Sequence, residues 1–358
     1  MTNITQELFS ADAMKEHLDL GSLVYNSAEV IEPSQLIWKH IEIPDGPSTI
    51  VCLRDKGGCL KGRTFAQPRK FISQGGVTYS GGIITDFVVS PKQKNPTFVI
   101  GITAKMKSLS GFEVIAHTSN EKSELIYRNL FKFPVVFRLS AYGVPIMPFK
   151  ILGNKFRVPK FFARPLESID LIFKFLFAAP LSLINRKSKL GWGNPPSNDD
   201  EVKIFADFKD HVGPHFERSN LFSEWRFQAP PLFRGKVKWL WKGGRCLGYV
   251  AFRSITLNGI SFVVIMDPIF SRRLSPFEAI NLKLLCISEA YISGSEAIFT
   301  MINTSNNALK MLRGFPFIHI PDKFLPHPTP IYIHKKANVL NDNDLSGTFL
   351  TLADLDYF

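Results

Sequence analysis

The stretch TSNEKSELIYRNLFKF, residues 118–133, decides which fold the chain can adopt. It follows the apolar run FEVIAHT, which is typical of a buried strand, and its own pattern is typical of a helix. Asn120 stands where the strand ends, Ser123 follows three positions later, and Tyr127 lies seven positions after the Asn. We therefore expect a strand, an Asn and a helix that closes with aromatic residues.

A second stretch, INTSNNALKMLRGFPF, residues 302–317, repeats this order. Asn303 follows the apolar run EAIFTMI, and a polar residue, Lys310, stands where the first stretch has its tyrosine. The dipeptide Gly314-Phe315 then closes the pattern. We expect a helix here, as in the first stretch.

The segments upstream of the two stretches also match. Asp86 lies in the β-branched run Ile83–Val89, 34 residues before Asn120, and Asp267 lies in an apolar run 36 residues before Asn303. A helix is expected after each run, and the second begins with SPFE, which is typical of a capping box with proline at the first helical position. The order and spacing predict an internal repeat.

Length and composition indicate two domains. The chain has 358 residues, which is long for one ordinary domain, and its 45% hydrophobic content is ample for two cores. We predict an α/β fold with two domains, each a mixed central sheet flanked by helices. The expected parts are an N-terminal domain at 1–150, a linker at 151–200, a C-terminal domain at 201–335 and a tail at 336–358.

The charge indicates the kind of partner. The formal net charge is +12 and the pI is about 9.5, which favours nucleic acid, an acidic membrane or a phosphorylated small molecule. The basic residues are spread along the chain, so a disordered nucleic-acid-binding arm is not expected. The four cysteines form no CxxC pair, and the N-terminus has no apolar signal core. Both features predict a cytoplasmic protein with reduced thiols.

The longest apolar stretch is IDLIFKFLFAAPLSLI, residues 169–184. Lys174 and Pro180 interrupt it, and it is too short to span a bilayer. We expect a linker helix that packs between the domains. A peripheral contact with a membrane surface, helped by the basic run NRKSK that follows, is the alternative.

The order of these motifs resembles the GNAT acyltransferase superfamily in a tandem arrangement. TDFVVSP looks like the family's fourth strand, and FERSNLFSEWRFQAP, GYVAFR and SGTFLTLADLDYF resemble tandem members linked to bacterial surface polysaccharide production. The first copy departs from the family pattern at Phe131, where Gly is usual, and the second at Lys310, where Tyr is usual. The tail has Thr348 where Trp is usual. The resemblance implies two GNAT-like domains.

The resemblance also implies a chemistry. It suggests acyl-CoA as cosubstrate, with acetyl-CoA favoured and no metal, and an amine on a sugar or sugar nucleotide as acceptor. The acid that protonates the leaving thiolate would be Tyr127, because a phenol of pKa about 10 can donate to a thiolate and be restored. The donor phosphates would lie at the helix start after the fourth strand. The residues implied in cofactor binding are Val88, Val89, Lys92, Lys94, Asn95, Thr97 and Asn120.

Each assignment has a structural alternative. The segment PKQKNPT, residues 91–97, lacks the family's Gly-rich loop and is also typical of a solvated basic turn. Tyr127 could instead be a packed helix aromatic. Glu124 and Asp86 are candidates for a general base, but the recurrence of Asp86 as Asp267 favours a structural role. The base is therefore unassigned, and a water could serve.

Other motifs favour structure over chemistry. FSRRLSP, with Arg272 and Arg273, is more typical of a helix cap than of a phosphate site. GGCLKGRT, residues 57–64, nearly matches a P-loop but has Arg in place of the essential Lys, so a turn between strands is expected. His211 and His215 have helical metal-pair spacing, but a Gly-Pro pair separates them, so we expect two ordinary loop histidines.

The leading function from the sequence is thus an acyl-CoA-dependent N-acyltransferase. One alternative is a non-catalytic binding or scaffold protein that kept the fold. The other is a Fem-type peptidyltransferase that uses aminoacyl-tRNA, which the positive charge would suit. The absence of a GxSxG motif argues against a serine hydrolase.

Overall fold

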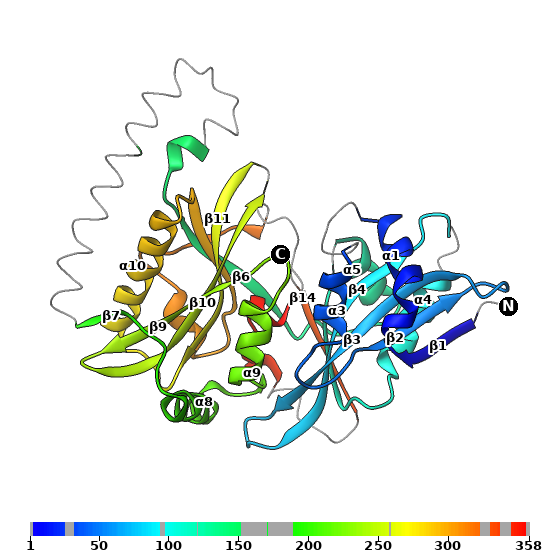
Figure 1. Ribbon diagram of the computed structural model, residues 1–358, viewed down its shortest axis with the longest axis horizontal. Helices are drawn as coiled ribbons and strands as arrows, with labels where there is room; N and C mark the ends of the chain where they lie inside the picture. The colour runs from blue at the N-terminus through cyan, green and yellow to red at the C-terminus, as the bar shows by residue number, and fades with distance from the viewer. Residues whose placement is uncertain are drawn as a thin grey trace, which may run out of the picture.

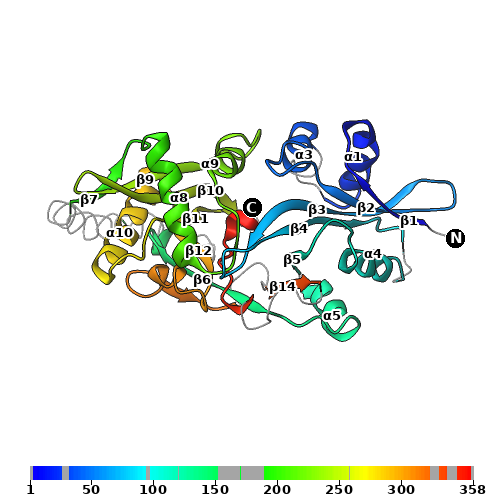
Figure 2. The same ribbon diagram turned by 90° about the horizontal axis from the view of Figure 1, so that it is seen from below.

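The computed structural model describes residues 3–25, 32–93, 97–119, 121–151, 170, 189–257, 259–322, 330–336 and 345–355. Within these residues, 14 strands form one continuous mixed sheet with helices on both faces (Figures 1 and 2). The predicted α/β class, with a mixed sheet in each half, is confirmed.

The first half holds β1 (Asn3–Leu8), β2 (Thr49–Arg54), β3 (Leu60–Ile72), β4 (Thr78–Val89) and β5 (Val114–Thr118). Its helices are α1 (Met14–Ser22), α3 (Pro33–His40), α4 (Thr97–Lys107) and α5 (Glu121–Asn129), with the short η1 (Ala11–Ala13) before α1. Helices α1 and α3 cover one face of the sheet, and α4 and α5 cover the other (Figure 2). Strands β4 and β5 are parallel, whereas their neighbours pair antiparallel.

The second half repeats this order with β9 (Lys236–Lys242), β10 (Arg245–Leu257), β11 (Ile260–Phe270), α10 (Pro276–Ile292) and β12 (Ala297–Asn303). Strands β11 and β12 are again the parallel pair. The other elements are β7 (Leu190–Gly193), α8 (Asn198–Val212), β8 (His215–Phe216), α9 (Asn220–Ser223), η2 (Glu224–Gln228), η3 (Leu309–Leu312), β13 (Ile318–Ile320) and η5 (Leu352–Asp354). The predicted repeat of strand, helix and strand is therefore present.

The two halves exchange a strand. β6 (Phe137–Pro145) follows the first half along the chain but pairs with β12 of the second half. β14 (Pro330–Lys335) follows the second half but pairs with β5 of the first, and the two exchanged strands also touch each other (Figure 1). Each half therefore needs a segment of the other to complete its sheet. The domain limits proposed from the sequence stay a prediction.

Aromatic packing joins the halves. The indole N–H of Trp38, on α3, donates to the carbonyl of Trp225 at 2.8 Å, and the indole of Trp225 donates to the carbonyl of Trp38 at 2.9 Å. The two rings stack with centroids 5.2 Å apart. Because both indole N–H groups are paired, these large rings can be buried without an unsatisfied donor.

Local signals in the sequence explain several elements. Ser275 caps α10 by accepting from the Glu278 N–H, and the Glu278 carboxylate accepts from the Ser275 N–H, as the predicted capping box requires. Gly243 and Gly244 both have positive φ in the turn between β9 and β10, which only glycine adopts easily. The near P-loop at residues 57–64 consists of the end of the predicted turn between β2 and β3 and the first residues of β3.

Two local predictions were wrong. The stretch after Asn303 forms turns and only the short 3-10 helix η3, because the side chains of Asn303 and Asn306 accept backbone N–H groups two residues ahead. His211 and His215 are not loop residues: the first lies in the last turn of α8 and the second in β8.

The apolar stretch at 169–184 lies outside the described residues except for Asp170, which accepts the N–H groups of Phe149 and Lys150. Within the described part of the chain, no helix is long and apolar enough to cross a membrane.

Candidate functional site

Both halves contain a β-bulge beside a buried aspartate. In β4 the register with β3 shifts between the pairs Arg63–Val88 and Phe65–Thr85, and Asp86 in this bulge has a φ of 48°. In β11 the register with β10 shifts next to Asp267. A non-glycine residue with positive φ is uncommon, so the surroundings of Asp86 must hold it in place.

Helix α3 supplies the partners of Asp86. The Lys39 ammonium lies 2.9 Å from one carboxylate oxygen, and the His40 ring nitrogen Nε2 lies 2.9 Å from the other. Burial opposes ionisation, but Lys39 and His40 hold the pKa of Asp86 well below its ordinary value. Burial also lowers the pKa of His40 to about 4, so the ring is neutral and its Nδ1 can accept from the Ser48 hydroxyl at 3.1 Å.

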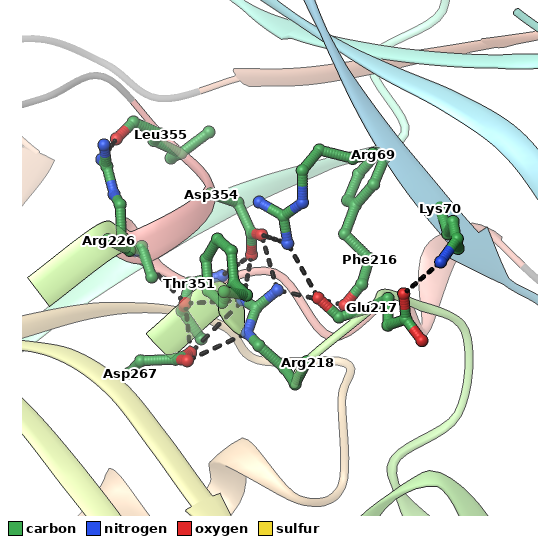
Figure 3. Close-up of polar contacts among 12 residues, drawn as sticks. Arg69, Lys70, Phe216, Glu217, Arg218, Arg226, Asp267, Thr351, Asp354 and Leu355 are labelled. Atoms are coloured by element: carbon green, nitrogen blue, oxygen red, sulfur yellow. Dashed lines mark hydrogen bonds and ion pairs between the residues drawn. The ribbon is translucent and has the colours of Figure 1, made fainter. Parts of the chain in front are cut away.

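Asp267 has a corresponding partner in the second half. Arg218 donates from Nε to Asp267 at 2.9 Å and from Nη1 to Asp354 at 2.8 Å, so one guanidinium joins two carboxylates. Figure 3 shows Arg218 between the two aspartates, with Thr351 donating to Asp267 at 2.8 Å. Arg69 of β3 lies 3.7 Å from Asp354. Two cations thus balance two buried carboxylates where the halves meet.

The parallel strands of the second half diverge, and the C-terminal segment 345–355 fills the space. β11 and β12 pair only from Phe262–Ala297 to Val264–Phe299, and η5 packs against both strands. The Asn303 side chain donates to the Ser346 and Thr348 carbonyls at 2.8 and 2.9 Å. The Asn303 side chain therefore binds the C-terminal segment 345–355.

The parallel strands of the first half diverge in the same way. β4 and β5 pair only from Gly81–Val114 to Ile83–Ala116, so no described strand pairs with residues 84–89 on the β5 side. The buried Thr85 hydroxyl has no hydrogen-bond partner among the described residues.

Tyr127 is buried on α5, with 4% of its surface exposed. Its ring packs edge-on against His117 of β5 and Tyr332 of β14. Burial raises the pKa of Tyr127, so the phenol stays protonated at neutral pH. This geometry suits both a packed aromatic and a proton donor.

Four of the seven predicted cofactor residues are described, and they lie at the end of β4 or soon after it. Val88 and Val89 pair with β3, Lys92 is exposed in the turn that follows, and Thr97 begins α4. Lys94, Asn95 and Asn120 lie outside the described residues. The assignment of all seven residues therefore remains a prediction.

Two other candidates have ionic partners. Glu124 forms ion pairs with Arg138 and Arg128, and Arg272 donates to Glu278 at 2.7 Å. The Glu124 carboxylate is therefore held by arginines, which disfavours a role as general base. Arg272 belongs to the helix cap, as its sequence context predicts. Within the described ranges, no three His, Cys, Asp or Glu side chains gather as a metal site would require.

Lys39, His40 and Arg218 were not predicted as partners of the buried aspartates. Each is a single basic residue in an unremarkable context, and only folding places it against a buried aspartate. A pocket beside α10, lined by Lys283 and Arg313 among others, was not predicted either. Its lining comes from two separate segments whose contact cannot be read from either one, although Arg273, Lys310 and Phe315 lie in motifs noted in the sequence.

Comparisons with known proteins show the fold. No protein-family model and no curated protein matches the chain. Among solved structures, a probable N-acyltransferase of unknown function from Enterococcus faecalis V583 is 12% identical and aligns over 94% of this chain and 71% of its own, with a TM-score of 0.53. Saccharomyces cerevisiae N-myristoyltransferase with bound myristoyl-CoA is 11% identical over 92% of this chain and 82% of its own, with a TM-score of 0.54.

A GCN5-related N-acetyltransferase from Anabaena variabilis ATCC 29413 is 10% identical and aligns over 92% of this chain and 72% of its own, with a TM-score of 0.55. Identities this low establish the fold alone. The chain consists of two GNAT-like α/β halves and shares the fold of these N-acyltransferases.

Proposed function

We propose that the protein is an acyl-CoA-dependent N-acyltransferase and that the reaction takes place in the first half. The observation that carries the proposal is the divergence of β4 and β5 beside the bulge at Asp86, which leaves one edge of residues 84–89 without a described strand partner. The similar structures named above are N-acyltransferases by title, and one contains myristoyl-CoA.

The acyl donor would lie along the end of β4. Its thioester would meet backbone N–H groups near Val88 and Val89, and Asn120 would flank it. Its phosphates would lie near Lys92, Lys94, Asn95 and Thr97, where the helix dipole of α4 adds a favourable field. The exposed side chain of Lys92 and the helix start at Thr97 support this placement. We propose acetyl-CoA as the donor.

The reaction would be a direct transfer. A neutral amine attacks the thioester carbonyl, a C–N bond forms and an N–H proton passes to water, since Glu124 and Asp86 are held in ion pairs. The C–S bond then breaks, and Tyr127 protonates the departing thiolate before solvent restores its proton. The products are an amide and the free thiol of CoA.

The second half would not react. Segment 345–355 fills the space between β11 and β12, and Lys310 stands where the first copy has Tyr127. We propose an amine on a sugar or sugar nucleotide as acceptor, which the net charge of +12 supports if the acceptor carries phosphate. We place the reaction in the cytoplasm, in keeping with four free cysteines.

The experiment is a screen of amines with acetyl-CoA and myristoyl-CoA, in which the released CoA thiol is measured. We expect thiol release that depends on a hexosamine or its nucleotide and gives an N-acylated product by mass. Transfer only from aminoacyl-tRNA would instead favour the Fem-type alternative. Failure of wild-type protein to bind any acyl-CoA would favour the scaffold alternative.

A further inference from the structure

Arg63 of β3 is a fully buried cation in the first half. It lies on the face of the sheet that α1 covers, and its Nη1 donates to the carbonyl of His17 on α1 at 2.7 Å. Its guanidinium carbon lies 5.1 Å from the centre of the Phe65 ring. These two contacts fix the orientation of the guanidinium. Helix α4, where the donor phosphates are proposed, covers the opposite face (Figure 2).

One edge of this guanidinium is unused. The nitrogens Nε and Nη2 of Arg63 have no hydrogen-bond partner within the described part of the chain. These two N–H groups lie side by side, and together they match the two oxygens of a carboxylate. Arg218 shows this match in the second half, because its Nε and Nη2 donate to the two oxygens of Asp267 at 2.9 and 3.3 Å.

The carboxylates near Arg63 already bind other cations. Burial lowers the pKa of Arg63, and the charge of Asp86 opposes this shift, but both oxygens of Asp86 contact the two partners described above. On α1, the Glu16 carboxylate accepts from Arg54 through both of its oxygens. A buried guanidinium whose charge is not balanced is costly, and a bound anion would offset that cost.

His17 supplies a further unused nitrogen beside Arg63. Its side chain is buried, and its Nδ1 has no hydrogen-bond partner among the residues that the structure describes. Burial and, to a smaller extent, the charge of Arg63 lower the pKa of His17 to about 3, so the ring is neutral at pH 7. A neutral imidazole can carry its proton on Nδ1 and donate it to an anion.

We propose that Arg63 binds the carboxylate of a small molecule beneath α1, through its Nε and Nη2 edge and with His17 as an additional donor. The full burial of the guanidinium favours a small acid over a polyphosphate or a nucleic acid, because a large anion would not fit under the helix. The inference goes beyond the proposed acyl transfer and does not depend on it.

The test is thermal unfolding of the full chain while sodium acetate replaces sodium chloride at constant ionic strength. We expect the melting temperature to rise and then to level off as the site fills, because a ligand that binds only the folded state stabilises it. Acetamide has the shape of acetate without its charge and should give no such rise. The measurement needs no acyl donor, so it can succeed or fail independently of the proposed function.

Two variants locate the effect. Arg63→Lys keeps the positive charge but loses the paired N–H edge, so the acetate concentration that gives half of the rise should increase about tenfold or more, as for a lost charge-assisted contact. Arg63→Met should abolish the rise. Arg234→Met, the same change at an exposed arginine, is the matched control and should keep it. Circular dichroism checks that each variant is folded.

Three results would overturn the inference. The first is the absence of a saturable rise in wild type. The second is the same rise with the same midpoint in Arg63→Lys or Arg63→Met, because it would come from a general salt effect or from another site. The third is an equal rise with acetate and acetamide, since the site would then not recognise charge. If Arg63→Met does not fold, Arg63→Lys and the acetamide comparison still decide.

Discussion

Replacing Arg218 with Met should destabilise the protein far more than the same change at Arg272. Both arginines contact carboxylates through more than one nitrogen, but Arg218 is fully buried whereas 42% of the Arg272 side chain is exposed. Without Arg218, the carboxylates of Asp267 and Asp354 stay buried and lose their main cation. Breaking a buried ion pair in this way costs about 3–5 kcal/mol.

The control, Arg272→Met, should cost below about 1 kcal/mol, because exposed pairs contribute little and Glu278 keeps Lys242 at 2.8 Å. The free energy of unfolding would be measured by urea titration of both variants and wild type, with far-ultraviolet circular dichroism as the signal. Equal losses for the two variants, or a loss below about 1 kcal/mol for Arg218→Met, would show that the buried cluster does not stabilise the junction of the halves.

Other predictions address the site and its surroundings. Tyr127→Phe removes one hydroxyl and should lower kcat about 10²- to 10⁴-fold at saturating acyl-CoA, while leaving thermal stability nearly unchanged. Lys310→Met should alter kcat far less. A larger loss in Lys310→Met than in Tyr127→Phe would place the acid in the second half. Burial lowers the pKa of His117 to about 3 and of His334 to about 4. The folded state therefore binds fewer protons than the unfolded state between pH 4 and 6.5. The free energy of unfolding should decrease as the pH is lowered through this window, and at pH 5 the loss should be about 2 kcal/mol per histidine. Urea titrations at pH 7 and 5 would measure this fall, His334→Gln should reduce it, and equal stability at both pH values would contradict it.

Short-range patterns predicted much of the fold. The spacing of Asp86 and Asp267 from their downstream Asn residues located the two parallel strand pairs, and the SPFE start located α10. Such signals act within one element or between neighbours, so the sequence displays them directly. The recurrence of the aspartate also indicated a structural role, and its ion pairs in both halves are consistent with one.

Long-range pairing was not visible in the sequence. The pattern of β6 predicts a strand but not its partner, so the exchange with β14 appears only in the structure. The failed helix after Asn303 has a similar cause, because the side chains of Asn303 and Asn306 bond to the backbone and to the tail. The pocket beside α10 is assembled from α10 and the η3 region, whose charges gain meaning only when they face one another.

The most direct test of the central claim is the affinity of the folded protein for acetyl-CoA, measured by calorimetry in wild type, Lys92→Glu and Arg273→Glu. We expect Lys92→Glu to weaken binding about tenfold or more, as one lost charge-assisted contact would, and Arg273→Glu to leave it unchanged. Weaker binding in Arg273→Glu with no change in Lys92→Glu would place the donor in the second half. No measurable binding of acetyl-CoA or myristoyl-CoA by wild type would contradict the proposed acyltransferase itself.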